Sequence, residues 1–164
     1  MAKSGTKAAS LSSLLCPIMG SKQTTPMKNL QDFEVLTDQL FSFLVDDYGY
    51  SPCPAHKGGI FDSAFVRSYA RDGMEVSICF GDADSHHLCQ IVFKDRREEK
   101  STDDRPQLRP FNHLLDLESP SFDDLTRADI SENLGYEDVL ARYAGLLHEF
   151  GSDALNGDFS RFFA

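Results

Sequence analysis

The residues best suited to chemistry gather in one short stretch of the chain, residues 79–89. This stretch combines soft and hard metal ligands, namely Cys79, Asp82, Asp84, His86, His87 and Cys89. Zinc would need four of them to converge tetrahedrally, and a calcium loop would need a glycine and a terminal bidentate glutamate that are missing here. Asp, Ser and His also collect in hairpin turns, because they tolerate turn geometry and hydrogen-bond their own backbone. The stretch is therefore predicted to be a hairpin turn, with no metal and no cofactor.

The four cysteines are predicted to be reduced thiols. Cys16, Cys53, Cys79 and Cys89 form no CxxC motif, and a chain of 164 residues is long enough to bury a core without covalent bridges. Cys79 and Cys89 fall on strands that would be neighbours, so they could form a disulfide only if they face each other. The favoured interpretation is that both are buried, reduced thiols that act as small apolar side chains. No base stands at a spacing that would activate Cys53.

No catalytic arrangement is recognisable elsewhere in the chain. His56, His113 and His148 are scattered, Lys57-Gly58-Gly59 lacks the rest of a phosphate-binding loop, and neither GxGxxG nor GxSxG occurs. Carboxylate pairs are inevitable among 26 acids, and the sequence does not show which of them are buried. We expect no catalytic residues.

The net charge of −10 restricts the class of partner. Nonspecific binding to nucleic acid or to an anionic membrane requires a surplus of Lys and Arg, so neither is expected. Residues 1–26 carry Lys3, Lys7 and Lys22 and no acid, which leaves 13 bases against 26 acids in residues 27–164. The charge predicts a protein partner with a basic surface.

The acids concentrate in residues 116–138, which contain Arg127 as their single base. One interpretation is a solvated loop that keeps the protein soluble. The alternative is a binding surface, because a field of carboxylates speeds the encounter with a basic protein and imitates a phosphate array. The candidate partner-binding residues are Asp116, Glu118, Asp123, Asp124, Asp129 and Glu132.

The chain divides at the start of its first periodic segment. Residues 1–26 lack sustained periodicity and are predicted to be a disordered leader or extension, whereas residues 27–164 are predicted to be a single α+β domain. The apolar run from Leu11 to Met19 is interrupted by Ser12, Ser13 and Pro17, so it fits neither a membrane span nor a signal peptide. Together with reduced cysteines, this favours a cytoplasmic location.

Apolar residues that recur every three or four positions predict two helices. The first is predicted over Leu30–Tyr48 and ends at Gly49; the second is predicted over Tyr136–Phe150 and ends at Gly151, with one more turn through Leu155.

Between the helices the sequence predicts an antiparallel meander. Residues 50–59 are predicted to be a loop, and the strands are Ile60–Ala70, Met74–Phe80 and His87–Lys94, joined by a tight turn at 71–73 and a longer one at 81–85. The second strand alternates between a core face and a wetter face. Residues 95–110 are predicted to be an exposed connection, and 111–117 a short strand or helical turn. The predicted fold is α+β, with a three- to four-stranded antiparallel meander flanked by an N-terminal and a C-terminal helix.

Three segments resemble small bacterial immunity-like proteins found beside polymorphic toxins. Phe41–Tyr50 resembles their "fLv.eyGf" opening, Val66–Ile78 resembles their "v.Y….v.i" strand pair, and Tyr143–Ser160 is similar to their "yA.lL….d.LnGDfs" ending. The resemblance covers roughly residues 30–160, without the charged connection at 95–110. It implies a non-enzymatic cytoplasmic protein that binds and neutralises a cognate toxin. The matching positions are structural, so no binding residue carries over.

Two other functions stay open at the level of sequence. A secretion-type chaperone for an effector is also small, acidic and α+β, and it would show an exposed apolar groove and form a dimer. A small ligand-binding or enzymatic domain would instead require a deep pocket with convergent polar groups.

Overall fold

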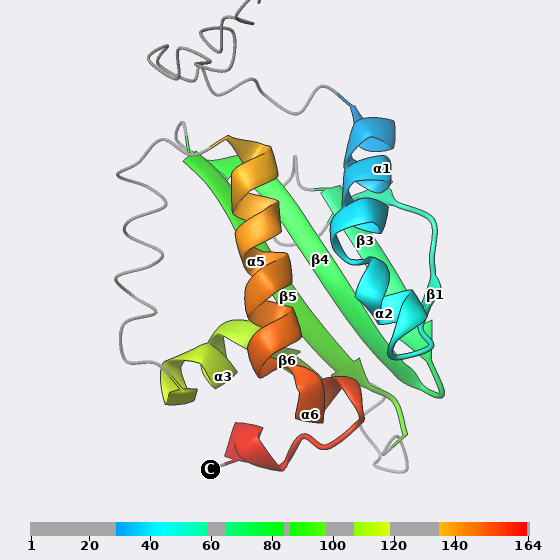
Figure 1. Cartoon of the computed structure of the whole chain (residues 1–164), viewed down its shortest axis with the longest axis vertical. Coiled ribbons are helices and arrows are strands. Elements are labelled where there is room, and N and C mark those ends of the chain that lie inside the picture. The colour runs from blue at the N-terminus through cyan, green and yellow to red at the C-terminus, as the bar shows by residue number, and fades with distance from the viewer. Residues whose placement is uncertain (1–28, 59–64, 84–85, 98–106, 119–134, 164) are drawn as a thin grey trace, which may run out of the picture.

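The computed structural model describes residues 29–58, 65–83, 86–97, 107–118 and 135–163. Helices α1 (Leu30–Leu40), α2 (Ser42–Asp46) and α5 (Tyr136–Phe150) lie over one face of an antiparallel sheet (Figure 1). Three shorter helices gather at one end of these layers: α3 (Phe111–Glu118), α6 (Ser152–Leu155) and a 3-10 helix at Ser160–Phe163.

The sheet is built around a meander of four strands that pair in the order of the sequence. These are β3 (Phe65–Arg71), β4 (Met74–Ala83), β5 (His86–Asp95) and β6 (Gln107–Pro110). Two strands of two residues, β1 (Ser51–Pro52) and β2 (His56–Lys57), pair with the outer side of β3. The predicted α+β meander between two helical segments is confirmed, and the predicted loop at 50–59 contains two short edge strands in addition. Pro52 is compatible with an edge because it has no N–H to donate.

The hairpins agree with the sequence to different degrees. Asp72 and Gly73 have φ of 47° and 79° between paired Arg71 and Met74, which matches the tight turn that was predicted. The next turn is shorter than predicted, because pairing continues as far as Ala83 and His86 and so satisfies more backbone groups. Residues 60–64 of the first predicted strand lie outside the described residues.

The predicted continuous helix over 30–48 is wrong, since it breaks at Phe41. Phe41 leaves the helical conformation with φ −106° and ψ 20°, and α2 begins at the next residue. The hydroxyl of Thr37 donates to the carbonyl of Phe33, a contact that bends helices. Phe41 and Leu44 are both fully buried, so the change of direction places both side chains in the core.

The segments after β5 correct one prediction and confirm another. Residues 107–110 were assigned to an exposed connection, but they form β6, and Arg109 within it is buried. Four residues containing a charge and a proline give too little alternation to reveal a strand. Helix α5 and the extra turn α6 have the predicted bounds.

The core fills the space between the helices and the sheet. It includes Val76, Ile78 and Phe80 of β4 together with Phe33, Leu140 and Leu147 of the helices. The opposite face of β4 is polar as predicted but not wet, because Ser77 is only 2% exposed. Its hydroxyl bonds to that of Ser68 and donates to Glu75, which also accepts from Lys94. The polar groups of this face therefore satisfy one another.

The turn at Gly157 gives the first testable prediction. Gly157 has φ of +90°, and a Cβ there would lie 2.6 Å from Nη1 of Arg97 and 2.9 Å from Sδ of Met74. We expect Gly157→Ala to lower the free energy of unfolding by about 1–3 kcal/mol, because alanine is strained at this positive φ and the ends of the Arg97 and Met74 side chains must shift. Urea unfolding measures the loss.

Gly145→Ala is the matched control for this substitution. Gly145 is exposed on α5 and an added Cβ meets nothing within 4 Å, so the change should stabilise the helix by about 0.5–1 kcal/mol. Equal effects of the two alanine substitutions would contradict the strained turn.

Candidate functional site

The predicted partner-binding residues fall mostly outside the described part of the chain. Asp116 and Glu118 lie in the last turn of α3. Asp123, Asp124, Asp129 and Glu132 lie in 119–134, outside the described residues. Their assignment as a binding surface remains a prediction.

The structure separates the two thiols of the 79–89 stretch. Cys79 pairs with Gln90, whereas Cys89 pairs with Phe80, so the cysteines lie on opposite faces of the sheet. They therefore cannot form a disulfide or coordinate one ion, and both are buried, as predicted. Burial raises the pKa of each thiol.

Helices α1 and α2 carry a charge pattern that the prediction overlooked. Residues 29–55 contain five acids and no Lys, Arg or His. Two further acids lie in the first turn of α5. We call these seven carboxylates the acidic helix layer: Asp32, Glu34, Asp38, Asp46, Asp47, Glu137 and Asp138. The signal is present in the sequence as a long run without bases, which coincides with the apolar spacing that predicts the helix.

The first turns of α1 and α5 lie at the same end of the molecule. The two helices run in the same direction over the sheet (Figure 1). Asp32 lies in the first turn of α1 and Glu137 in the first turn of α5, where the helix dipole stabilises a carboxylate. Residues more than one hundred positions apart thus contribute to one acidic surface.

Several arginines of the sheet and its flanking segments bond to backbone carbonyls or to Asp95 rather than to the acidic helix layer, whereas Arg67 pairs with two carboxylates of that layer. Arg71 donates to the carbonyls of Tyr48 and Leu155. Arg97 donates to Asp95, and Arg109 lies 3.8 Å from the same carboxylate. These arginines therefore connect secondary-structure elements through hydrogen bonds and ion pairs.

Arg67 is the most deeply embedded of these bases. It is 4% exposed on β3 and contacts Glu34 at 2.6 Å and Asp38 at 2.8 Å on α1. Its Nη1 also donates to the carbonyl of Cys53, and Tyr69 donates its hydroxyl to Asp38. Burial lowers the pKa of the guanidinium, but the hydrogen bonds with Asp38 and Tyr69 outweigh burial and raise it. Glu34 and Asp38 are therefore structural members of the acidic helix layer.

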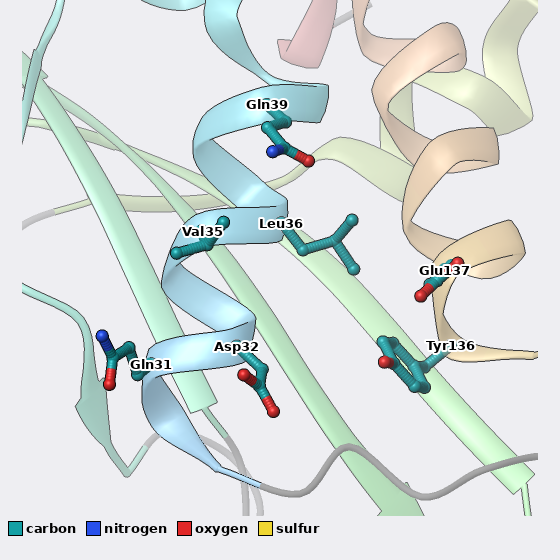
Figure 2. A pocket seen from close by; sticks show the side chains of 7 residues that line it. All are labelled: Gln31, Asp32, Val35, Leu36, Gln39, Tyr136 and Glu137. Atoms are coloured by element: carbon teal, nitrogen blue, oxygen red, sulfur yellow. The ribbon is translucent and has the colours of Figure 1, made fainter.

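A shallow groove opens between α1 and α5, with a volume of about 330 Å³. Its lining residues are Gln31, Asp32, Val35, Leu36, Gln39, Tyr136 and Glu137. Figure 2 shows Leu36 and Asp32 extending from α1 toward Tyr136 and Glu137 on the facing helix. Burial, followed by the charge of Glu137 and the hydrogen bond with it, raises the pKa of the Tyr136 phenol. The groove combines apolar side chains with two exposed carboxylates.

These features define a two-layer α+β protein whose helical side is acidic and grooved. No family model, curated protein or solved structure matches the chain. Among the described helices, none has both the length and the apolar character needed to cross a membrane.

Proposed function

We propose that this chain is a non-enzymatic protein-binding module of the immunity type, which binds a basic cognate toxin in the cytoplasm and neutralises it. The observation that carries the proposal is the acidic helix layer, in which residues 29–55 hold five acids without a base. Such a field attracts a basic protein and accelerates encounter. It also extends to α5, directly after the acidic segment 116–132 of the sequence.

The segments that resemble immunity-like proteins serve to hold the fold together. Gly49 ends the α1–α2 segment with φ of +71°, and its N–H donates to the carbonyl of Val45. Phe159 is 6% exposed and packs against Phe93. These roles agree with a scaffold whose binding residues lie elsewhere, on the surface.

Reversing two exposed charges tests the proposal against the protein encoded by the adjacent reading frame. Asp32→Lys combined with Glu137→Lys should weaken the complex about ten- to a hundredfold, mainly by slowing association, and should flatten its salt dependence. Neither carboxylate forms an ion pair within the described part of the chain, so the fold should persist. Association rates at several salt concentrations measure the effect.

A second double reversal controls for net charge. Glu149→Lys with Asp153→Lys changes the charge equally at two exposed residues outside the acidic helix layer. The ion pair of Asp153 with Arg161, 3.9 Å between exposed side chains, contributes little to stability. It should retain more of the affinity. If the first variant keeps its low-salt affinity, the binding surface is wrong; if the unaltered chain gives no protection from the adjacent gene product, the immunity function is wrong.

A further inference from the structure

We propose that the groove between α1 and α5 receives one aliphatic or aromatic side chain of the partner, flanked in that partner by Lys or Arg. This inference deepens the proposed function and rests on it. It assigns a specific anchoring point within the acidic helix layer and a chemistry for the segment that occupies it.

The apolar part of the groove supplies the anchor. Val35 is 52% exposed, although it lies on a helix whose other apolar side chains pack inward. Leu36 and Tyr136 are half-buried beside it and offer further apolar surface. A volume of about 330 Å³ accommodates one large side chain rather than a whole helix. Interfaces commonly concentrate their binding energy in such a filled apolar pocket.

The rim of the groove determines the charge of the occupant. Asp32 lies on the α1 side and Glu137 on the α5 side, and both are exposed. Gln31 and Gln39 add amides but no positive charge. A negatively charged segment would be repelled by both walls, whereas Lys or Arg beside the anchor would face a carboxylate on either side. Charge complementarity therefore selects a basic segment with an apolar centre.

Three short peptides test this chemistry without knowledge of the partner. The full chain, labelled with ¹⁵N, is titrated at low salt with acetyl-Arg-Trp-Arg-amide, acetyl-Arg-Gly-Arg-amide and acetyl-Glu-Trp-Glu-amide. We expect the first to shift the amide signals of the groove residues and to bind about tenfold more tightly than either of the others. Equal binding of the Gly peptide, or shifts centred outside the groove, would overturn the inference.

Two exposed valines provide matched variants. Val35→Ser should weaken binding of acetyl-Arg-Trp-Arg-amide about tenfold, whereas Val45→Ser, at a valine 41% exposed on α2, should leave it unchanged. Both positions are at the surface, so both variants should fold. Equal effects of the two substitutions would overturn the groove as the anchoring point.

The same variants separate this inference from the proposed function. A cognate complex that is weakened by the Asp32 and Glu137 reversals but not by Val35→Ser would contradict the groove and leave the acidic layer in place. A chain that binds the Trp peptide in the groove but protects against no toxin would support the groove chemistry and contradict the immunity function.

Discussion

Replacing Glu34 and Asp38 by their amides should cost the protein more stability than replacing the arginine that they hold. Arg67 is 4% exposed, while the side chains of Glu34 and Asp38 are 39% and 44% exposed. Glu34→Gln with Asp38→Asn leaves a buried cation facing neutral amides, and we expect a loss of about 3–5 kcal/mol in the free energy of unfolding. Arg67→Met leaves two carboxylates that water can reach, so we expect a loss of about 1–3 kcal/mol.

The triple variant distinguishes an unpaired charge from lost packing. Adding Arg67→Met to the two amide substitutions removes the stranded cation, so the triple variant should be more stable than the double one. Denaturant unfolding followed by circular dichroism measures all four proteins, and an unchanged slope against denaturant shows that the native state stays compact. A triple variant that is less stable than the double one would contradict an electrostatic origin for the loss.

This network also decides which carboxylates are available to a partner. Glu34 and Asp38 belong to the acidic helix layer, but their charges are partly cancelled by Arg67 at 2.6 Å and 2.8 Å. Asp32 and Glu137 have no such ion pair within the described residues. Substitutions meant to test binding should therefore alter these two, because changes at Glu34 or Asp38 would confuse lost binding with lost stability.

The elements that could be predicted are those that a local pattern specifies. Helix α5 has its predicted bounds because its apolar residues keep helical spacing and Gly151 follows as the C-cap. The break at Phe41 gives no such signal, since Phe41 is apolar and a continuous helix suits the spacing equally well. It is fixed by burial of Phe41 and Leu44 against the sheet, which is a tertiary effect.

Of the candidate site, only its acidic charge could be predicted from the sequence. A deficit of bases is visible in the sequence both before α5, where it predicted an acidic surface, and in α1, where no acidic surface was predicted. The groove depends on the distance at which α1 and α5 pack on the sheet. All the strands lie between these two helices in the sequence, so no local pattern specifies that distance. The arginine pairs join distant residues as well: Arg67 and Asp38 are 29 positions apart. No spacing rule relates such residues, so the partners of the arginines could be identified only from the structure.

Replacing Asp95 by asparagine should lower the free energy of unfolding by about 3–5 kcal/mol at neutral pH. Asp95 is 4% exposed at the end of β5, where it accepts from Nε and Nη2 of Arg97 at 2.9 Å and faces Arg109 at 3.8 Å. Arg97 also donates to the carbonyl of Gly157, and both arginines lie over the ring of Phe159. The substitution removes the carboxylate around which β5, β6 and the C-terminal segment are joined, while the side chain of Arg109 stays 7% exposed.

The pH dependence of stability identifies this effect as electrostatic. The hydrogen bonds of Arg97 lower the pKa of Asp95 below its ordinary value of 3.8, more than burial raises it. The ionised carboxylate therefore contributes stability above pH 3.8, which is lost as the pH falls through the folded-state pKa. Stability of the unaltered protein should decline on acidification, whereas Asp95→Asn should start lower and decline less, so the two unfolding curves converge.

Glu75→Gln provides the matched comparison for acidification. Burial raises the pKa of Glu75, but its hydrogen bonds with Lys94 and Ser77 outweigh burial and lower it. The side chain of Lys94 is 27% exposed and regains water when the carboxylate is removed, so the loss should be smaller than at Asp95. Unfolding free energies between about pH 7 and pH 2 measure both variants. If Asp95→Asn follows the acid dependence of the unaltered chain in parallel, Asp95 is not the carboxylate whose charge joins the C-terminal segment to the sheet.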